Sequence, residues 1–313
     1  MCFPLRKKLQ NNPIVRIFLY VAFFLFVLII AGIVFFRMGK KDYANWVMIA
    51  QGSTWKAHVA YLAVEGVSVY YDTGITLQNV TRVSSTDGMR QMFVPAGEFL
   101  MGVQKESFIA PAHKVYLDAF WIDMTEISNE MYALCVEAGI CKPPALSYLS
   151  DSHYGDEAFR KHPVVYVTWL QARDYCEWAG RRLPTEAEWE KAARGTDNRP
   201  YPWGKDHPDP GLVNFDNMIA STTPVYWFPF GASPYGILNM AGNVREWVWD
   251  WYADDYYQIS PSQNPMGPEE GKKRSLRGGS FIDISRRVRV DNRLSHDPYS
   301  PGYNRGFRCA VSP

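Results

Sequence analysis

The sequence predicts strands, helices and a long ordered loop, preceded by one N-terminal transmembrane helix. Lys114–Met124 alternates apolar and polar residues, as a strand with one buried face does. Thr185 is followed three residues later by Glu188, which is the capping box that opens a helix. Arg199–Phe230 is rich in Pro, Gly and aromatic residues, so we expect an ordered loop there. Ile17–Phe36 holds no charged residue.

Ile17–Phe36 is long and apolar enough to be a transmembrane helix. Its twenty residues, at a rise of about 1.5 Å each, span the ~30 Å hydrocarbon core of a bilayer. Basic residues flank both ends, so charge alone does not fix the orientation. A cleaved signal peptide is the alternative, but the run exceeds a typical apolar signal region and no Ala-x-Ala site follows it.

Local patterns predict further elements beyond residue 91. Ser128–Ala138 has the pattern of a helix, and so has Thr168–Trp178, with Thr168 as its N-cap. Phe93 and Phe99 each begin a short strand around a Gly-Glu turn. The aromatic residues expected to be buried in the irregular stretch are Tyr201, Trp203 and Trp227.

The positions of the five cysteines indicate the compartment. Cys2 precedes the apolar run, and four cysteines follow it: Cys135, Cys141, Cys176 and Cys309. An even set on one side suggests two disulfides and an oxidising environment. We therefore expect residues 1–16 to be a cytoplasmic tail and the large C-terminal part to be extracytoplasmic, periplasmic or extracellular, on a single-pass protein of the cell membrane. Cys135 and Cys141 are close enough in sequence to form a local disulfide at the end of a helix.

The overall charge gives no reason to propose a nucleic acid partner. The formal net charge is +1, and the chain has no basic tail. An aromatic content of 15% with eleven tryptophans instead predicts a large core built from rings.

Gly236–Trp251 gathers oxygen ligands of the kind that Ca²⁺ prefers. The candidate ligands are the side chains of Asn239 and Glu246 and the carbonyl groups of Gly242 and Val244. The alternative is that the asparagines cap turns and Glu246 pairs with an arginine. The stretch then continues as a strand, and we expect its alternating tryptophans to point into the core: Trp247, Trp249 and Trp251.

This segment resembles the signature of the formylglycine-generating-enzyme, or sulfatase-modifying-factor, domain family. Four other stretches agree with the family in the same order: Phe93–Gly102, His162–Gly195, Arg277–Phe281 and Gly306–Ala310. The resemblance covers residues 91–313 and leaves residues 37–90 as a membrane-proximal linker or small addition. It implies an α+β domain with much irregular structure, a formylglycine-generating-enzyme-like variant of the C-type lectin fold, usually with structural calcium.

The resemblance also implies a disulfide and a second metal site. It pairs Cys176 with Cys309. It places a possible second calcium at four residues whose spacing is shortened relative to the family pattern: Asn214, Phe215, Asn217 and Ile219.

The catalytic cysteine pair of the family is missing. Family enzymes use copper, bound by two cysteines shortly after the Gly-Gly-Ser motif, to oxidise a substrate cysteine. Here these positions hold Asp283 and Val288. Because Cu(I) requires soft thiolate ligands, no copper and no formylglycine synthesis are expected.

No other catalytic constellation stands out. The six histidines are scattered, without an i,i+4 pair or a His-x-Glu group. A set of Ser280, His296 and Asp283 is conceivable, but no local signature supports it.

The C-terminal third is strongly divided in charge. Lys272–Arg293 holds eight basic residues, and Glu246–Glu270 just before it holds six acidic ones. Val288 and Val290 alternate with charged residues, as in a strand whose polar face lines the family's substrate groove. The groove candidates are Ser280, Asp283, Arg287, Arg289, Asp291 and Arg293. The alternative is that these arginines and acids neutralise one another inside the domain.

The sequence thus favours a membrane-anchored, extracytoplasmic and non-catalytic module for recognition or structure. Its expected partners are the membrane and the other protein subunits of a membrane assembly, to which it would be an accessory subunit. The alternative is an enzyme of the same fold with a relocated active site.

Overall fold

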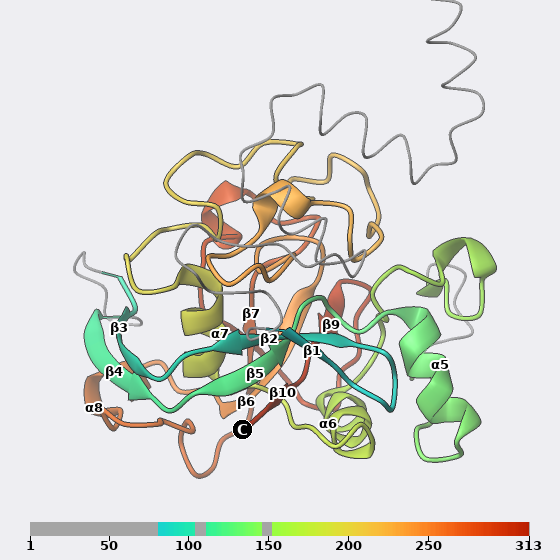
Figure 1. The fold of residues 1–313 in the computed structure, drawn as a ribbon, viewed down its shortest axis with the longest axis horizontal. Helices are drawn as coiled ribbons and strands as arrows, with labels where there is room; N and C mark the ends of the chain where they lie inside the picture. Colours follow the sequence, from blue (N-terminus) through green and yellow to red (C-terminus); the bar gives the residue numbers. More distant parts are fainter. Residues whose placement is uncertain (1–80, 104–110, 146–151, 313) are drawn as a thin grey trace, which may run out of the picture. The chain divides into compact units, whose positions relative to one another are not determined.

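The computed structural model describes residues 81–103, 111–145 and 152–312 (Figure 1). The predicted transmembrane span at 17–36 lies outside these residues. Among the helices within them, none has both the length and the apolar character that a membrane span requires. The following description concerns the domain that these residues form.

The first sheet joins the two ends of the domain. Its strand order is β1-β2-β5-β10, with every neighbouring pair antiparallel. The strands are β1 (Thr81–Val83), β2 (Arg90–Val94), β5 (Phe120–Asp123) and β10 (Ala310–Val311). Because β1 pairs with β2, the sheet begins ten residues before the boundary expected at residue 91. Because β10 pairs with β5, the C-terminal segment returns to the first part of the domain.

The second sheet is a hairpin of β3 (Gly97–Met101) and β4 (His113–Leu117). The sequence predicted one strand over Lys114–Met124, and this was wrong. The chain forms β4 and β5, which belong to different sheets. Asp118, between them, exchanges two hydrogen bonds with Asn264, through its amide and through its carboxylate. The alternation of apolar residues continues across this bend, so it does not reveal the break.

The third sheet holds the tryptophan-rich strand. Its order is β8-β7-β6-β9, and only the β6–β9 pair within this sheet is parallel. The strands are β6 (Arg245–Trp251), β7 (Arg274–Arg277), β8 (Leu294–His296) and β9 (Arg305–Phe307). The predicted strand at this position is confirmed.

Only one of the three alternating tryptophans lies in the core. Trp247 is fully buried, whereas Trp249 and Trp251 are half-buried. Between the latter rings and Trp169 lies Arg274, whose guanidinium carbon is 3.6 Å from the Trp251 centroid and 3.7 Å from the Trp169 centroid. Arg274 thus covers part of the aromatic surface through cation–π contacts. The expectation that all three rings point into the core was wrong, because two of them stay half-buried.

Three helices begin where their caps predict. They are α5 (Asn129–Glu137), α6 (Trp169–Trp178) and α7 (Glu186–Arg194). The N-caps are Ser128, Thr168 and Thr185, and the last two form full capping boxes. The remaining helical segments are η3 (Glu157–Phe159), η4 (Pro229–Gly231), α8 (Tyr256–Ile259) and η5 (Ser285–Arg287).

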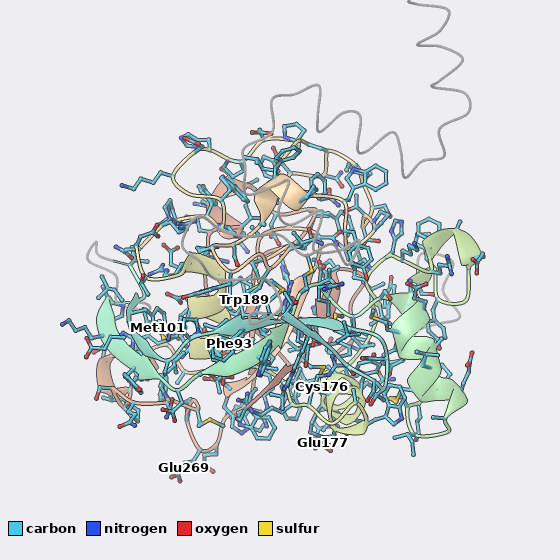
Figure 2. All side chains as sticks on the ribbon, in the orientation of Figure 1. Phe93, Met101, Cys176, Glu177, Trp189 and Glu269 are labelled. Carbon is cyan, nitrogen blue, oxygen red and sulfur yellow. A yellow bond between two sulfur atoms is a disulfide. The ribbon has the colours of Figure 1, made fainter. Side chains whose placement is uncertain are left out.

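Helix α7 is the central element of the described domain. It packs against strands of the second and third sheets, and each of its residues is buried. Trp189 lies inside the domain, whereas Glu177 and Glu269 are exposed (Figure 2). A second apolar cluster lies between α5, α6 and the third sheet, and includes Tyr132, Tyr175 and Phe307.

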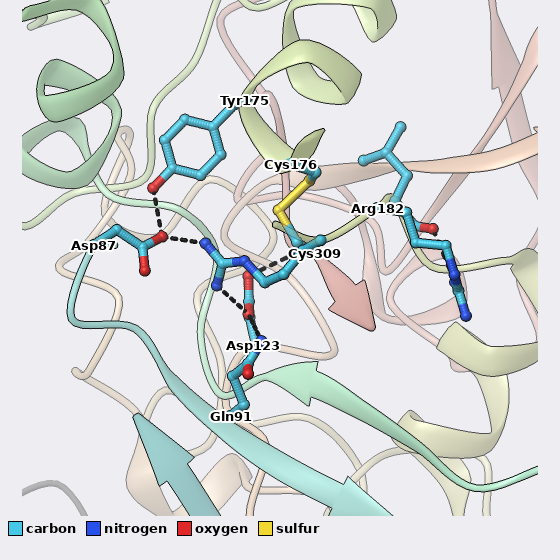
Figure 3. The surroundings of a disulfide bond; sticks show 9 residues. Asp87, Gln91, Asp123, Tyr175, Cys176, Arg182 and Cys309 are labelled. Atoms are coloured by element: carbon cyan, nitrogen blue, oxygen red, sulfur yellow. Dashed lines mark hydrogen bonds and ion pairs between the residues drawn. A yellow bond between two sulfur atoms is a disulfide. The ribbon is translucent and has the colours of Figure 1, made fainter. Parts of the chain in front are cut away.

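Both predicted disulfides are confirmed. Cys135 on α5 bonds to Cys141 six residues later, and Cys176 on α6 bonds to Cys309, 133 residues later. Figure 3 shows the polar network beside the second disulfide. The Cys309 amide donates to Asp123 at 2.8 Å, and Arg181 forms ion pairs with Asp123 and Asp87. The disulfide and this network join α6 to both ends of the first sheet.

The irregular stretch at 199–230 is ordered, as expected, but its aromatic residues differ in burial. Tyr201 is 6% exposed, and its ring stacks on Trp203. Trp227 is 59% exposed, so its expected burial was wrong. The sequence indicates that such a ring gains from burial, but only the packing of the loop decides whether a partner surface is available.

Candidate functional site

Asp283, which the family resemblance places at the first catalytic cysteine position, is a carboxylate whose oxygens are already hydrogen-bonded. Asp283 accepts hydrogen bonds from Arg245 Nε at 2.9 Å and Nη2 at 2.7 Å. The Ser280 amide and hydroxyl donate to the same carboxylate, at 2.9 and 2.8 Å. Burial alone would raise the pKa of Asp283, but these donors and the charge of Arg245 outweigh burial and lower it. Asp283 is therefore a fixed anion.

Val288, which the resemblance places at the second cysteine position, belongs to the core. Val288 is fully buried in an apolar cluster with Tyr201, Val213, Phe215 and Ala241. A valine side chain offers no atom that could bind copper, and here it is surrounded by the side chains of a hydrophobic cluster. The residues present therefore do not fit a copper centre of the thiolate type.

The conceivable Ser280, His296 and Asp283 set is only partly assembled. Ser280 and Asp283 are hydrogen-bonded, but Ser280 is fully buried and also accepts a hydrogen bond from Asn304. His296 lies on β8, across from Arg274. Among the residues that the structure describes, no hydrogen bond or ion pair joins His296 to Ser280 or Asp283. A serine nucleophile of this kind needs an accessible hydroxyl in contact with the imidazole that takes its proton. Here the hydroxyl is buried and donates to Asp283, and His296 does not contact it.

The predicted groove strand over Arg287–Arg293 was wrong. The chain forms η5 and then turns, with Val288 and Val290 both fully buried. The Val290 amide donates to the Pro200 carbonyl at 3.0 Å, so neighbouring irregular chain takes the place of a strand partner. Two valines that alternate with charged residues are compatible with this backbone as well as with a strand.

Most of the predicted groove charges neutralise one another inside the domain. Arg289 donates to Asp291 at 2.5 and 2.9 Å. Arg293 forms an ion pair with Glu186, the first residue of α7, at 2.9 Å and is buried. Arg287 differs, because its side chain is exposed and no ion pair joins it to any residue that the structure describes. The surface therefore offers less free charge than the sequence suggests.

The predicted calcium ligands lie beside a buried ion pair. Both carboxylate oxygens of Glu246 accept hydrogen bonds from Arg308, each at 2.7 Å, and the Trp189 indole donates to one of them at 2.8 Å. The arginine pairing that the sequence left as an alternative is thus present. Glu246 could ligate an ion only in competition with these donors.

A second carboxylate binds the two asparagines of the turn. Asn239 Nδ2 donates to Glu126 at 2.8 Å and Asn243 Nδ2 does so at 2.9 Å. Burial raises the pKa of Glu126 to about 7 against the opposing charge of Arg308, and the charge of Glu246 adds to the rise. Glu126 is thus a second buried carboxylate close to Arg308, whose side-chain partner is Glu246.

The possible second calcium site contains an unsatisfied acceptor. Asn214 is buried, and its Oδ1 has no hydrogen-bond partner in the described part of the chain. Its Nδ2 donates to the Ser221 carbonyl at 2.8 Å. Asn217 and Ile219 are exposed. The donor chemistry fits a hard cation at Asn214, and both calcium sites stay predictions.

No group of three or more His, Cys, Asp or Glu side chains suited to a metal occurs within residues 81–103, 111–145 and 152–312. The sequence reasoning missed three partners that shape the site: Glu126, Arg245 and Arg308. Arg308 lies inside a stretch that resembles the family, so its position was a usable signal. Arg245 lies inside Gly236–Trp251, which also resembles the family, so its position was a signal of the same kind. Glu126 had no such signal, since its role depends on partners distant in sequence.

Comparison with known proteins identifies similar chains. A model of the "Sulfatase-modifying factor enzyme 1-like domain" matches residues 77–313. The chain is 35% identical over 289 residues to the formylglycine-generating enzyme of Streptomyces coelicolor, and the match covers 73% of this chain and 90% of that protein. It is 37% identical to the serine/threonine-protein kinase pkn1 of Chlamydia caviae over 70% of this chain, but spans only 37% of that relative.

Solved structures agree in fold. "Treponema denticola variable protein 1" superposes with a TM-score of 0.61 at 25% identity. PvdO from Pseudomonas aeruginosa superposes with a TM-score of 0.63 at 24% identity. Each match covers 74% of this chain and 98% of the other.

Proposed function

Because this chain belongs to the sulfatase-modifying factor enzyme 1-like domain family, we propose that it is a non-catalytic member that serves in recognition or structure. The proposal places the domain outside the cytoplasm on a single-pass anchor, as an accessory subunit of a membrane protein assembly. The anchor and compartment are inferred from the apolar run and the cysteines.

The fixed Asp283 carboxylate carries the proposal. It stands at the first catalytic cysteine position and is held by Arg245 and Ser280, while Val288 at the second position is buried. Restoring two thiolates there would require both substitutions and the removal of an ion pair. One relative has a name that describes an inactive enzyme. The chain is 37% identical, over 47% of its length, to the "Inactive C-alpha-formylglycine-generating enzyme 2" of Bos taurus.

The test combines an activity assay with co-purification. We expect the full chain, extracted in detergent and supplied with copper, to leave a cysteine-containing sulfatase peptide unchanged by mass spectrometry. The Streptomyces coelicolor enzyme under the same conditions is the positive control. We also expect a membrane protein to copurify in a fixed ratio. Conversion of the peptide, or a chain that purifies alone from its own membrane, would refute the proposal.

We further propose calcium at Asn239, Gly242, Val244 and Glu246, where the ion would hold the turn that precedes β6. At ten times Kd, a bound ion adds about 1.4 kcal/mol to the free energy of unfolding, or roughly 3–6 °C in Tm. We therefore expect the Tm of the wild type to rise by this amount between chelator and millimolar calcium.

Asn239→Gly should abolish the calcium-dependent rise in Tm. Asn239 has φ 54°, a conformation that glycine adopts freely, so this change removes the amide oxygen without backbone strain. Asn264→Gly is the matched control, because Asn264 also has positive φ, 45°, and lies in another loop. A calcium-dependent rise that survives in Asn239→Gly would refute this site.

A further inference from the structure

Two adjacent arginines on η5 differ from the arginines that surround them. Arg286 and Arg287 are exposed, and neither forms an ion pair with any residue described by the structure. By contrast, the neighbouring basic residues are paired: Arg245 with Asp283, Arg289 with Asp291, and Arg293 with Glu186. Among the described residues 283–293, the unpaired positive charge is therefore concentrated on η5.

The backbone beneath these arginines is held from several sides. The Tyr201 hydroxyl donates to the Ser285 carbonyl at 3.4 Å, and Asn292 Nδ2 donates to the Arg287 carbonyl at 3.0 Å. Gly279 approaches so closely that a Cβ there would lie 2.7 Å from the Arg287 carbonyl oxygen. The next residue, Val288, is anchored in the core. The two guanidinium groups thus extend from a preorganised base, which lowers the entropy cost of binding.

Exposed apolar side chains lie close to the two arginines. One directly precedes η5 in the chain, and two belong to a loop that is hydrogen-bonded to the residues just before η5. Ile284 is 43% exposed and precedes η5 directly. Met218 and Ile219 are 44% and 47% exposed. Their loop is hydrogen-bonded to residues 281–283, which directly precede Ile284 and η5. The bonds run from the Asp216 amide to the Asp283 carbonyl, and from the Asn217 amide to the Phe281 carbonyl. The surface therefore combines two positive charges with an apolar part.

We propose that the η5 surface, defined as Arg286, Arg287, Ile284, Met218 and Ile219, binds an acidic segment of a partner protein that also carries aliphatic residues. Guanidinium groups bind carboxylates through charge-assisted and often bidentate hydrogen bonds. Attraction to an anionic bilayer typically needs about four to eight clustered basic residues, and η5 supplies two. The chemistry thus favours a protein segment, and this inference rests on the proposed recognition function.

The test uses the full chain in detergent and a fluorescein-labelled peptide of alternating Glu and Leu. We expect saturable binding by fluorescence anisotropy that weakens as salt rises. R286E/R287E should lower the affinity at least tenfold, while R286K/R287K should retain most of it. K272E/K273E is the matched control, because Lys272 and Lys273 are an exposed basic pair outside this surface, and it should change the affinity less than twofold. An unchanged Tm of R286E/R287E verifies its folding.

Several results would overturn the proposed surface. These are equal losses in the two reversal variants, equal binding of a Lys-Leu peptide, and complete competition by phosphatidylglycerol added to the detergent micelles, which would indicate a lipid surface. Co-purification separates this inference from the proposed function. A subunit that copurifies with the wild type and equally with R286E/R287E leaves the accessory role intact and refutes the surface. Peptide binding without any copurified subunit supports the surface and refutes the accessory role.

Discussion

Replacing Arg308 by leucine should lower the free energy of unfolding by about 3–5 kcal/mol, the range for breaking a buried ion pair from one side. Arg308 is fully buried and binds both oxygens of Glu246. Its Nη1 and Nη2 also donate to the carbonyl groups of Asp123, Met124 and Leu238. The variant leaves Glu246 and Glu126 as neighbouring buried anions without this guanidinium. Chemical denaturation at pH 8 measures the loss.

The loss in Arg308→Leu should be smaller at pH 5. In the wild type, burial raises the pKa of Glu126 to about 7, and burial raises that of Asp123 to about 6. The folded state therefore binds protons more tightly than the unfolded state, so this part of the stability is present at low pH and is lost as pH rises from about 4 to 7. Removing Arg308 raises the pKa of Glu126 further and strengthens this dependence.

Arg182→Leu is the control for Arg308→Leu. Arg182 also binds a carboxylate with two hydrogen bonds, to Glu188 at 2.7 Å each, but its side chain is 32% exposed. An exposed pair contributes only about 0–1 kcal/mol. Equal losses in the two variants, or no dependence of the Arg308→Leu loss on pH, would contradict the role assigned to the buried pair.

Removal of the long-range disulfide should have an effect of similar size. Cys176→Ala with Cys309→Ala opens a loop of 133 residues. The chain-entropy model gives a loss of about 5 kcal/mol for such a loop and about 2 kcal/mol for a loop of six residues. The double variant should therefore unfold at much lower denaturant concentration than the wild type.

The local disulfide provides the comparison. Cys135→Ala with Cys141→Ala opens six residues and should cost less than half as much. The m-value should be recorded for both variants, since it reports a change in the unfolded state. A larger loss from the local pair than from the long-range pair would show that native packing around α5, rather than loop closure, determines the effect.

Local signals in the sequence determined the helix starts and the disulfide set. A Thr cap and its partner three residues later act within one turn, so α6 and α7 begin where the caps indicate, and α5 begins where its helical pattern does. Four cysteines beyond the apolar run, with the family resemblance, fixed both pairings. The replacement of two thiols by Asp283 and Val288 rests on residue identity and on the family resemblance, and it stays a prediction.

Only the tertiary structure decided which charges pair, where strands break and which rings are exposed. Arg308 and Glu246 are 62 residues apart, and Arg293 and Glu186 are 107 apart, so no local pattern selects these partners among the acids. At the break between β4 and β5, Asp118 is hydrogen-bonded to Asn264, which is 146 residues away in sequence. The burial of Val288 beside exposed Arg287 follows from how irregular chain packs. These features depend on contacts between distant segments, and the energy of such contacts is defined only once the fold has brought the segments together.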